Sequence, residues 1–434
     1  MNYELNKSFI KSHLNDDVNK LALSKFPEGV DKQLVIRQIQ ARQLLKKKLP
    51  SWSENDSLLF PKRLSLEQCS SELTARYKSF LTTNQHESSR IDINANSCEL
   101  VDKRKILVDL TGGMGVDTVF LSDSFNHTFY VEMQEELCEI AKHNFNVLKK
   151  NIEVVNDNAE HFLTICPEVD CIYLDPARRD EYGRKMVSLH DCSPDVAELQ
   201  DLLLMKAKTV MIKLSPMLDI DIIRKELKNI KEIHIVAVRN ECKEVLVVLS
   251  QQITESTSQR DISDIYTPRL ITTDIHEDWN FSFCDDEEQN AQWTLADSIG
   301  RYLYEPSVAC MKAGCFKLIS QRLNLNKLHR NSHLYTSDEL VSYFPGRIFE
   351  VIDTIPFDKK TKKAISLICQ RSTVNGQQTL STNGSQPKVS VAVRNFPLSA
   401  EELKKQLGVK DGNDFYIFGT TMKGDKKVVI IGVR

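Results

Sequence analysis

The sequence predicts an α/β protein whose central part, from about Leu100 to Ser250, forms a largely parallel sheet flanked by helices. Short β-branched runs alternate with helical patterns there, and the last two runs stand close enough together to form a hairpin. The first hundred residues show helical periodicity without strand alternation. At 434 residues the chain is too long for one core, so we expect several domains.

The composition indicates an ordinary globular protein, because 41% of the residues are hydrophobic and 27% are charged. No run approaches the ~18 apolar residues of a membrane span, and the first residues do not resemble a secretory signal. The 11 cysteines are scattered, and the closest pairs lack the two-residue gap of metal and redox motifs. We therefore expect a cytoplasmic protein with reduced thiols, no membrane segment and no metal.

Residues 1–100 are expected to be a helical region. Apolar residues recur at helical spacing in residues 32–48, a stretch that ends before Pro50. Residues 64–81 form a second amphipathic stretch.

The central region, residues 101–250, contains the predicted strands. They cover residues 106–110, 129–133, 153–155, 171–175 and 210–214, and a final antiparallel hairpin pairs residues 233–238 with 245–249 across six connecting residues. Apolar strands separated by helices are typical of a parallel sheet that is buried on both faces.

Two α+β modules are expected after a polar linker, over residues 271–355 and 356–434. The polar stretch 372–388 is predicted to be a loop, and the last 46 residues read as strand, helix, strand and strand. Ser399, followed three residues later by Glu402, is a capping-box signature for that helix.

Charge is divided unevenly along the chain. From Arg301 to Arg434 there are 21 Lys and Arg against 11 Asp and Glu, whereas the preceding part has 36 against 49. The first balance is +10 and the second is -13. This split indicates either a polyanion partner for the basic module or two solvated surfaces of opposite sign.

A glycine loop follows the first predicted strand, in the sequence VDLTGGMGVD of residues 108–117. Gly113 and Gly115 permit a tight turn and the close approach of a ligand. Asp109 precedes them, where it can hold a positive ammonium group directly or through water. S-adenosylmethionine (SAM) carries such a group, whereas a dinucleotide brings a negative pyrophosphate to this turn.

Polar side chains also follow the next strands. Glu132 can accept both ribose hydroxyls of a nucleoside, which fits NAD and SAM alike. Asp157 or Asn158, with Asn158 favoured, can meet the adenine amino group. Asp175 can accept hydrogen bonds from an amine, and Pro176 stiffens its loop.

These elements, in this order, resemble the class I SAM-dependent methyltransferases over residues 100–250. The resemblance implies a Rossmann-like sheet with a terminal antiparallel hairpin, SAM as the cofactor, and a catalytic loop after the fourth strand. It implies cofactor contacts at Asp109, Thr111, Gly112, Gly113, Met114, Gly115, Asp117, Glu132, Asp157, Asn158 and Ala159, and catalytic residues at Asp175, Pro176, Arg178 and Arg179.

The catalytic loop departs from the pattern of the amino-methylating members, Asp/Asn-Pro-Pro-aromatic, because Ala177 and Arg178 occupy the last two positions. In this loop, Tyr182 or the guanidinium group of an arginine would then have to stack on the base. Alternatively, the arginines contact phosphate or form surface salt bridges. No cysteine lies in this loop, which speaks against methylation of a pyrimidine carbon. Lys213 ends the fifth strand, where it either lines the substrate mouth or has no such role.

Further motifs resemble a bacterial, Bacteroidetes-type methyltransferase family with a ferredoxin-like middle module and a C-terminal THUMP-like domain, over essentially the whole chain. They lie at residues 175–195, 212–216, 241–244, 303–306, 344–349 and 393–399. THUMP domains elsewhere bind tRNA, which agrees with the basic C-terminal part.

The sequence thus predicts a SAM-dependent methyltransferase acting on a base nitrogen of tRNA or rRNA. The alternatives are a methyltransferase acting on a protein or small molecule, and a SAM-binding or RNA-binding protein without catalysis. Asp109 makes an NAD-dependent oxidoreductase the least favoured reading. The oligomeric state is left open.

Overall fold

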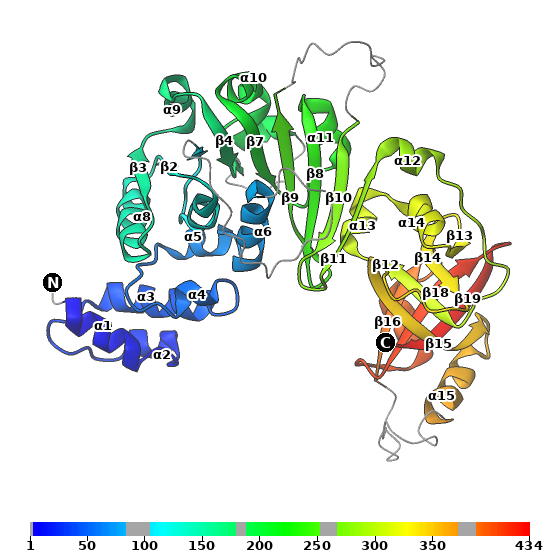
Figure 1. The fold of residues 1–434 in the computed structure, drawn as a ribbon. Coiled ribbons are helices and arrows are strands. Elements are labelled where there is room, and N and C mark those ends of the chain that lie inside the picture. The colour runs from blue at the N-terminus through cyan, green and yellow to red at the C-terminus, as the bar shows by residue number, and fades with distance from the viewer. Residues whose placement is uncertain (1–2, 84–104, 179–187, 252–266, 372–387) are drawn as a thin grey trace, which may run out of the picture. The chain divides into compact units, whose positions relative to one another are not determined.

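The computed structural model describes residues 3–83, 105–178, 188–251, 267–371 and 388–434. They form two compact units (Figure 1). Unit 1 comprises Met1–Ile233 and Glu244–Tyr266, and unit 2 comprises His234–Lys243 and Thr267–Arg434. None of the described helices combines the length and apolarity needed to cross a membrane.

Unit 1 begins with the helical region that the sequence predicts. Its helices are α1 (Tyr3–Ser12), α2 (Val18–Leu23), α3 (Lys32–Leu45), α4 (Pro50–Ser53), α5 (Arg63–Gln68) and α6 (Glu72–Thr83). One hydrophobic cluster contains Leu45 and Trp52 from this region together with Tyr130 and Phe145 from the α/β part. The helical region and the α/β part therefore share a core.

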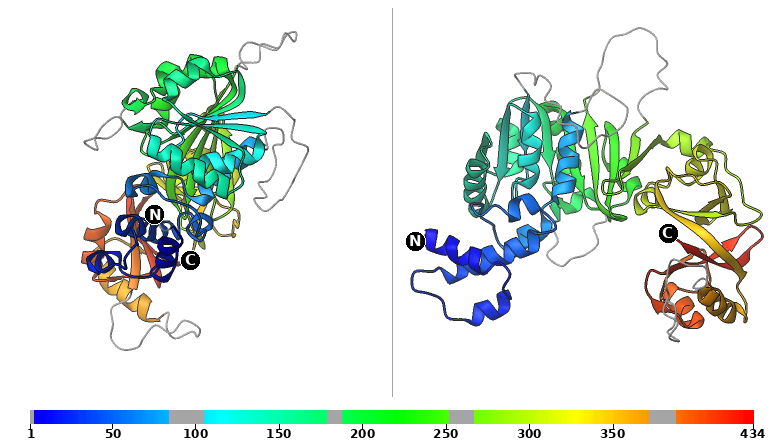
Figure 2. Two further views of the ribbon diagram at one scale, coloured as in Figure 1. Left: turned by 90° about the vertical axis from the view of Figure 1, so that its left-hand side faces the viewer. Right: turned by 60° about the horizontal axis from the view of Figure 1, so that its bottom comes forward.

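The α/β part of unit 1 is a sheet with helices on both sides of its strands, as the edge-on view in the left panel of Figure 2 shows. The strands are β1 (Ile106–Asp109), β2 (His127–Glu132), β3 (Ile152–Asn156), β4 (Val169–Leu174), β7 (Ala207–Leu214) and β9 (Glu241–Ser250). Their order is β9-β7-β4-β1-β2-β3, and β9 is antiparallel to β7 while the others are parallel. The Rossmann-like architecture is confirmed.

Helices follow most of these strands. They are α7 (Val116–Leu121), α8 (Glu135–Val147), α9 (Ala159–Ile165), α10 (Val196–Lys206) and α11 (Ile220–Glu226), with short 3₁₀ turns η1 (Ser122–Ser124) and η2 (Leu189–Asp191) and a small two-stranded sheet of β5 (Ala177–Arg178) and β6 (Cys192–Ser193).

The predicted terminal hairpin is formed by β8 (Ile230–Val238) and β9, but its turn is shorter than expected. Only Arg239 and Asn240 connect the strands, and both adopt left-handed backbone angles, with φ of 54° and 59°. Two such residues make the turn type whose twist matches a hairpin. The carboxylate of Asp274 stabilises it by accepting hydrogen bonds from the Arg239 amide at 3.1 Å and the Asn240 amide at 2.6 Å.

Beyond β8 the sheet continues with β10 (Arg269–Asp274) and β11 (Trp279–Cys284). The sequence predicts an α+β module from residue 271 onward, and these two strands instead extend the first sheet. They form an antiparallel pair in which Asp274 lies opposite Trp279.

Unit 2 contains an eight-stranded sheet in the order β13-β14-β12-β15-β19-β18-β16-β17. Its strands are β12 (Tyr302–Pro306), β13 (Asn326–His329), β14 (Ser332–Ser337), β15 (Gly346–Pro356), β16 (Lys388–Arg394), β17 (Lys410–Asp411), β18 (Phe415–Met422) and β19 (Lys426–Val433). Its helices are α12 (Asp285–Asn290), α13 (Val308–Ala313), α14 (Phe316–Arg322), α15 (Thr361–Arg371) and α16 (Ala400–Leu407).

The long strand β15 pairs with β12 on one side and with β19 on the other. One sheet therefore contains strands from both predicted C-terminal modules. The Ser399 cap of α16 is confirmed, since its hydroxyl accepts from the Glu402 amide while the Glu402 carboxylate accepts from the Ser399 amide. The predicted polar loop lies outside the described residues except for Lys388.

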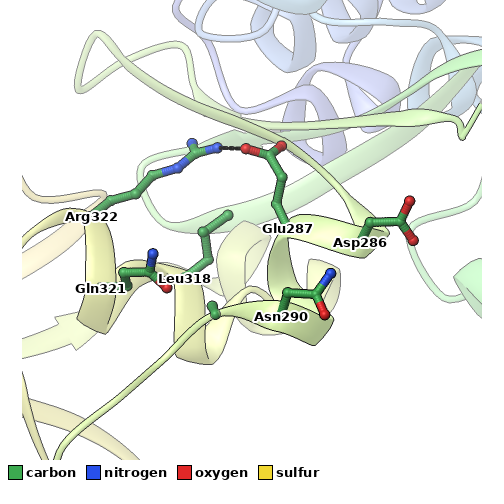
Figure 3. A pocket seen from close by; sticks show the side chains of 7 residues that line it. Asp286, Glu287, Asn290, Leu318, Gln321 and Arg322 are labelled. Atoms are coloured by element: carbon green, nitrogen blue, oxygen red, sulfur yellow. Dashed lines mark hydrogen bonds and ion pairs between the residues drawn. The ribbon is translucent and has the colours of Figure 1, made fainter.

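A hollow of about 370 Å³ lies between α12 and α14 (Figure 3). Its wall includes Leu318, Gln321, Arg322 and Glu287. The last two form an ion pair in which the Arg322 guanidinium nitrogen lies 2.5 Å from a Glu287 carboxylate oxygen. The residues that the sequence predicts for cofactor binding and catalysis do not line it.

Candidate active site

The carboxyl ends of four parallel strands meet at one edge of the unit 1 sheet. Asp109 ends β1 and lies in register with Tyr130 on β2 and Tyr173 on β4. Glu132 ends β2 and lies opposite Asn156 on β3. Because ligands of open α/β sheets bind at this edge, the strand order brings the predicted residues to one place.

Each of the three positions in the loop after β1 is occupied by glycine for a different physical reason. A Cβ on Gly112 would lie 2.2 Å from the Tyr130 ring, so this glycine is required by packing. Gly115 has a φ of 79° and a Cβ there would lie 2.9 Å from Phe145. Gly113 has a φ of 53°, and the nearest atom to an added Cβ would be the Thr111 carbonyl oxygen at 3.7 Å. The open face of the loop is therefore at Gly113.

The carboxylate of Glu132 fastens this loop to the end of β2. One oxygen accepts a hydrogen bond from the Gly113 amide at 2.9 Å, and the other accepts from the Gln134 amide at 2.9 Å. The side chain is 8% exposed. A carboxylate has about four acceptor sites in all, so Glu132 retains capacity for hydroxyl groups of a ligand beside Gly113.

Asp109 is enclosed beneath the loop with an exposure of only 1%. Its carboxylate accepts hydrogen bonds from the Thr111 amide at 3.0 Å and the Thr118 hydroxyl at 2.5 Å. Burial raises the pKa of Asp109 to about 7, despite these two hydrogen bonds. In this geometry Asp109 holds the loop in shape from below.

This pKa predicts a pH dependence of stability. Asp109 loses its proton at about pH 3.9 in the unfolded chain and at about pH 7 in the folded chain. Between these values the folded state holds the extra proton, so stability falls as the pH rises. Relative to Asp109→Asn, we expect the wild type to lose about 1.4 kcal/mol per pH unit at most between pH 5 and 6, and less as the pH approaches 7, where folded Asp109 is half ionised. Urea unfolding at pH 5, 6, 7 and 8 measures this, and parallel curves for both proteins would contradict it.

The predicted catalytic loop is held through both the backbone amide and the side-chain carboxylate of Asp175. Its backbone amide donates a hydrogen bond to the Thr111 hydroxyl at 2.6 Å, so Thr111 joins the two loops. Its carboxylate forms an ion pair with the Lys213 ammonium on β7. Ala177 and Arg178 after Pro176 form β5, which pairs with β6. The Asp175 side chain remains 34% exposed.

Arg178 is the second residue of β5. Arg179 and Tyr182, which the sequence also singles out, lie outside the described residues.

Behind Asp175 and Lys213 lies a buried charge network, which we define as Lys78, Asp117, Glu244, Lys213 and Asp175. Lys78 on α6 is 0% exposed, and its ammonium contacts Glu244 at 2.7 Å and Asp117 at 3.3 Å. Burial raises the pKa of Glu244 in spite of Lys78 and Lys213. Burial also tends to raise the pKa of Asp117, but the same two lysines and its hydrogen bonds lower it on balance.

Two further hydrogen bonds complete the surroundings of Asp117. The hydroxyls of Ser70 and Tyr173 both donate to one of its carboxylate oxygens at 2.7 Å. Asp117 is therefore an internal anchor between α6, α7 and β4. The sequence predicts a cofactor contact at this position, and the structure places the side chain in the network.

The remaining predicted cofactor residues are distributed between the interior and the edge. Met114 and Ala159 are buried, at 5% and 7% exposure. Asn158 caps α9 by accepting a hydrogen bond from the His161 amide at 2.7 Å. Asp157 contacts the His161 ring at 2.6 Å, and this hydrogen bond lowers the pKa of Asp157. Both polar residues thus lie where β3 joins α9.

The sequence patterns do not indicate a role for Met133 or Lys78 at this edge. The pattern places Met133 in the second strand, but β2 ends at Glu132 and Met133 is 72% exposed. Lys78 had a signal in the sequence, since it falls at helical spacing with Ala75 and Thr82, both of which are buried. A lysine on such a stripe indicates a buried partner.

One group of three possible metal ligands occurs among the described residues, namely His190, Asp195 and Glu198, whose ligand atoms lie within 4.8 Å of one another. Asp195 accepts a hydrogen bond from the Glu198 amide at 3.1 Å as the cap of α10, and it contacts the His190 ring at 2.9 Å. The expected absence of a metal stays a prediction.

The sheet order, the antiparallel strand β9 beside β7 and the glycine loop together define the class of this protein as a Rossmann-like methyltransferase fold. A crystal structure of a candidate methyltransferase from Porphyromonas gingivalis W83 is similar with 31% identity and a TM-score of 0.79, covering 99% of this chain and 97% of that chain. The chain belongs to the same family as that protein.

Family models match two parts of unit 2, a ferredoxin-like domain at residues 302–345 and a THUMP domain-like region at residues 377–434. The predicted membership in a methyltransferase family with these two modules is confirmed. No curated protein matches the sequence.

Shorter solved structures also match part of the chain. An rRNA methylase from Streptococcus thermophilus has 18% identity and a TM-score of 0.27, covering 35% of this chain and 89% of that chain. A candidate methyltransferase from Streptococcus mutans in complex with SAH has 16% identity and a TM-score of 0.27, covering 35% of this chain and 90% of that chain.

Proposed function

We propose that the protein is a SAM-dependent methyltransferase that methylates a base nitrogen in tRNA or rRNA. The observation that carries the proposal is the meeting of Glu132, the open side of Gly113 and the Asp175 carboxylate at one sheet edge, in the fold of a methyltransferase family.

The residues at this edge fit SAM. The space beside Gly113 admits a ligand close to the backbone, and Glu132 next to it can accept ribose hydroxyls. The thioether of Met133, exposed directly after Glu132, provides a polarizable surface for an adenine ring. Asp157 and Asn158 stand at the next strand end for the adenine amino group.

The proposed chemistry needs positioning more than acid–base catalysis. Bound SAM supplies a methyl group on a sulfonium, which is already a good leaving group. The Asp175 carboxylate accepts an N–H of the target base and thereby orients the nitrogen lone pair. The same carboxylate is suited to accept the proton that the methylated nitrogen gives up. Arg178, two residues past Pro176, is proposed to contact phosphate or to stack on a base.

RNA as the substrate is supported by the basic character of the THUMP-like part. Helices α15 and α16 are in contact there. Exposed lysines lie just before α15 and in its first turn, near the end of α16 and at the start of β17, namely Lys359, Lys360, Lys362, Lys363, Lys405 and Lys410. Such a surface can neutralise phosphates without reading sequence, so base selection would rest with the active site.

Replacing Glu132 with Gln is expected to weaken SAM binding about tenfold to a hundredfold, because hydrogen bonds to a charged group are worth about 1.5–3 kcal/mol. Calorimetry with SAM measures this, with Glu135→Gln, an exposed acid at the start of α8, as the matched control. Unchanged affinity in Glu132→Gln would exclude the proposed cofactor site.

The substrate is then tested with total RNA from a strain that lacks the gene, using radiolabelled SAM and the wild-type protein. Incorporation into RNA supports the proposal. SAM binding with transfer only to protein or small molecules, or with no transfer at all, would replace it with one of the two alternative functions.

A further inference from the structure

We propose that Lys213 is a positioning residue, which holds the Asp175 carboxylate in the orientation that receives the N–H of the target base. The inference deepens the proposed function and rests on it. No cofactor or substrate contact of Lys213 is needed, because it acts through Asp175.

The strand register determines the meeting of these two residues. Strands β4 and β7 are parallel neighbours, and their last paired residues are Leu174 and Ile212. Asp175 directly follows Leu174 at the end of β4, and Lys213 follows Ile212 on β7, so the two residues lie at the same level of adjacent strands. Their ion pair is the direct consequence.

Lys213 is suited to be a permanent cation. Its side chain is only 14% exposed, and burial by itself would lower its pKa. Asp175, Asp117 and Glu244 act in the opposite direction and raise the pKa of Lys213 on balance. A lysine that stays protonated cannot serve as a base, but it can fix a carboxylate by charge and hydrogen bond.

The buried charge network limits where the Lys213 ammonium can go. Glu244 and Asp117 are already engaged by Lys78, at 2.7 Å and 3.3 Å. Asp117 also accepts hydrogen bonds from Ser70 and Tyr173. Lys213 is left to pair with Asp175, the one acid of the network that is a third exposed. Internal charges thus orient an acid at the surface of the site.

The backbone restrains Asp175 from the other side through the Thr111 hydroxyl at 2.6 Å. With its amide and its carboxylate both held, Asp175 has a defined direction before any substrate arrives. Preorganised groups of this kind lower the barrier because they need no reorientation during the reaction.

The test compares Lys213→Met and Lys213→Arg with the wild type. Lys208→Met is the control, since Lys208 lies on the same strand with a side chain that is 75% exposed. Each protein is assayed for its SAM dissociation constant by calorimetry, and for kcat and KM with total RNA from the deletion strain. We expect Lys213→Met to lower kcat about a hundredfold while the SAM dissociation constant changes less than about threefold. Lys213→Arg should recover kcat to within about tenfold of the wild type, because it restores the cation.

The outcomes separate the two proposals. No methyl transfer to RNA by the wild type would overturn the proposed function and this inference with it. An active wild type together with an equally active Lys213→Met would overturn the inference alone. Loss of SAM binding in Lys213→Met, or failure of Lys213→Arg to recover kcat, would show a structural role and overturn it as well.

Discussion

Replacing Lys78 with Met is expected to lower the free energy of unfolding by about 3–5 kcal/mol, the usual cost of removing one partner from a buried ion pair. Lys78 is 0% exposed and contacts both Glu244 and Asp117. Methionine fills the same volume but leaves the two acids buried without this cation. Urea unfolding of the wild type and the variant at neutral pH measures the difference.

Two further variants distinguish a charge effect from a packing effect. Arg76→Met on the same helix removes an ion pair with Glu72 in which the arginine side chain is 54% exposed, and it should cost less than about 1 kcal/mol. Lys78→Met combined with Glu244→Leu should recover part of the loss, because one stranded charge is then removed. Equal stability of Lys78→Met and the wild type would contradict the prediction that the Lys78 ammonium stabilises the buried carboxylates of Glu244 and Asp117.

Local patterns sufficed to predict most of the sheet. The strands that end in Asp109 and Glu132 are apolar runs followed by helical periodicity, and their burial needs no knowledge of distant residues. The cap of α16 was equally local, since Ser399 and Glu402 stand three residues apart.

The conformation of the turn between β8 and β9 could not be predicted from the local sequence. Its sequence, Arg239-Asn240, lacks glycine, and the left-handed backbone is supported by the Asp274 carboxylate from a later strand. No residue within six positions of the turn indicates that Asp274 will support it. The predicted connection was therefore too long.

In the candidate site, too, some features follow from the local sequence and others depend on distant residues. The positions of Gly112 and Asp109 could be predicted from the glycine loop, but the reasons for them depend on tertiary structure. Gly112 is required by the Tyr130 ring on the neighbouring strand, and Asp109 faces inward to Thr118. The pair of Lys78 and Glu244 joins residues 166 positions apart, and a single sequence contains no signal for that pairing.

Replacing Asp175 with Ala is expected to reduce kcat about 10²–10³-fold, the range for loss of a preorganised polar group that acts in the transition state. Asp175 is the acid of the network that reaches the surface of the proposed site, and alanine cannot accept the N–H of a base. SAM affinity should change little, because Glu132 and Gly113 lie on other strand ends. Calorimetry and methyl transfer to RNA from the deletion strain measure the two effects.

Asp175→Asn is the matched variant for this prediction. The amide oxygen can still accept one N–H, while the charge that pairs with Lys213 is lost. We expect its kcat to fall between those of the wild type and Asp175→Ala, since hydrogen bonds to a charged acceptor are roughly twice as strong as neutral ones. If Asp175→Ala methylated RNA as fast as the wild type, the acceptor of the target nitrogen would have to be sought elsewhere on the sheet edge. If both variants lost SAM affinity as well as turnover, Asp175 would belong to the cofactor site, and the division of roles between Glu132 and Asp175 would be wrong.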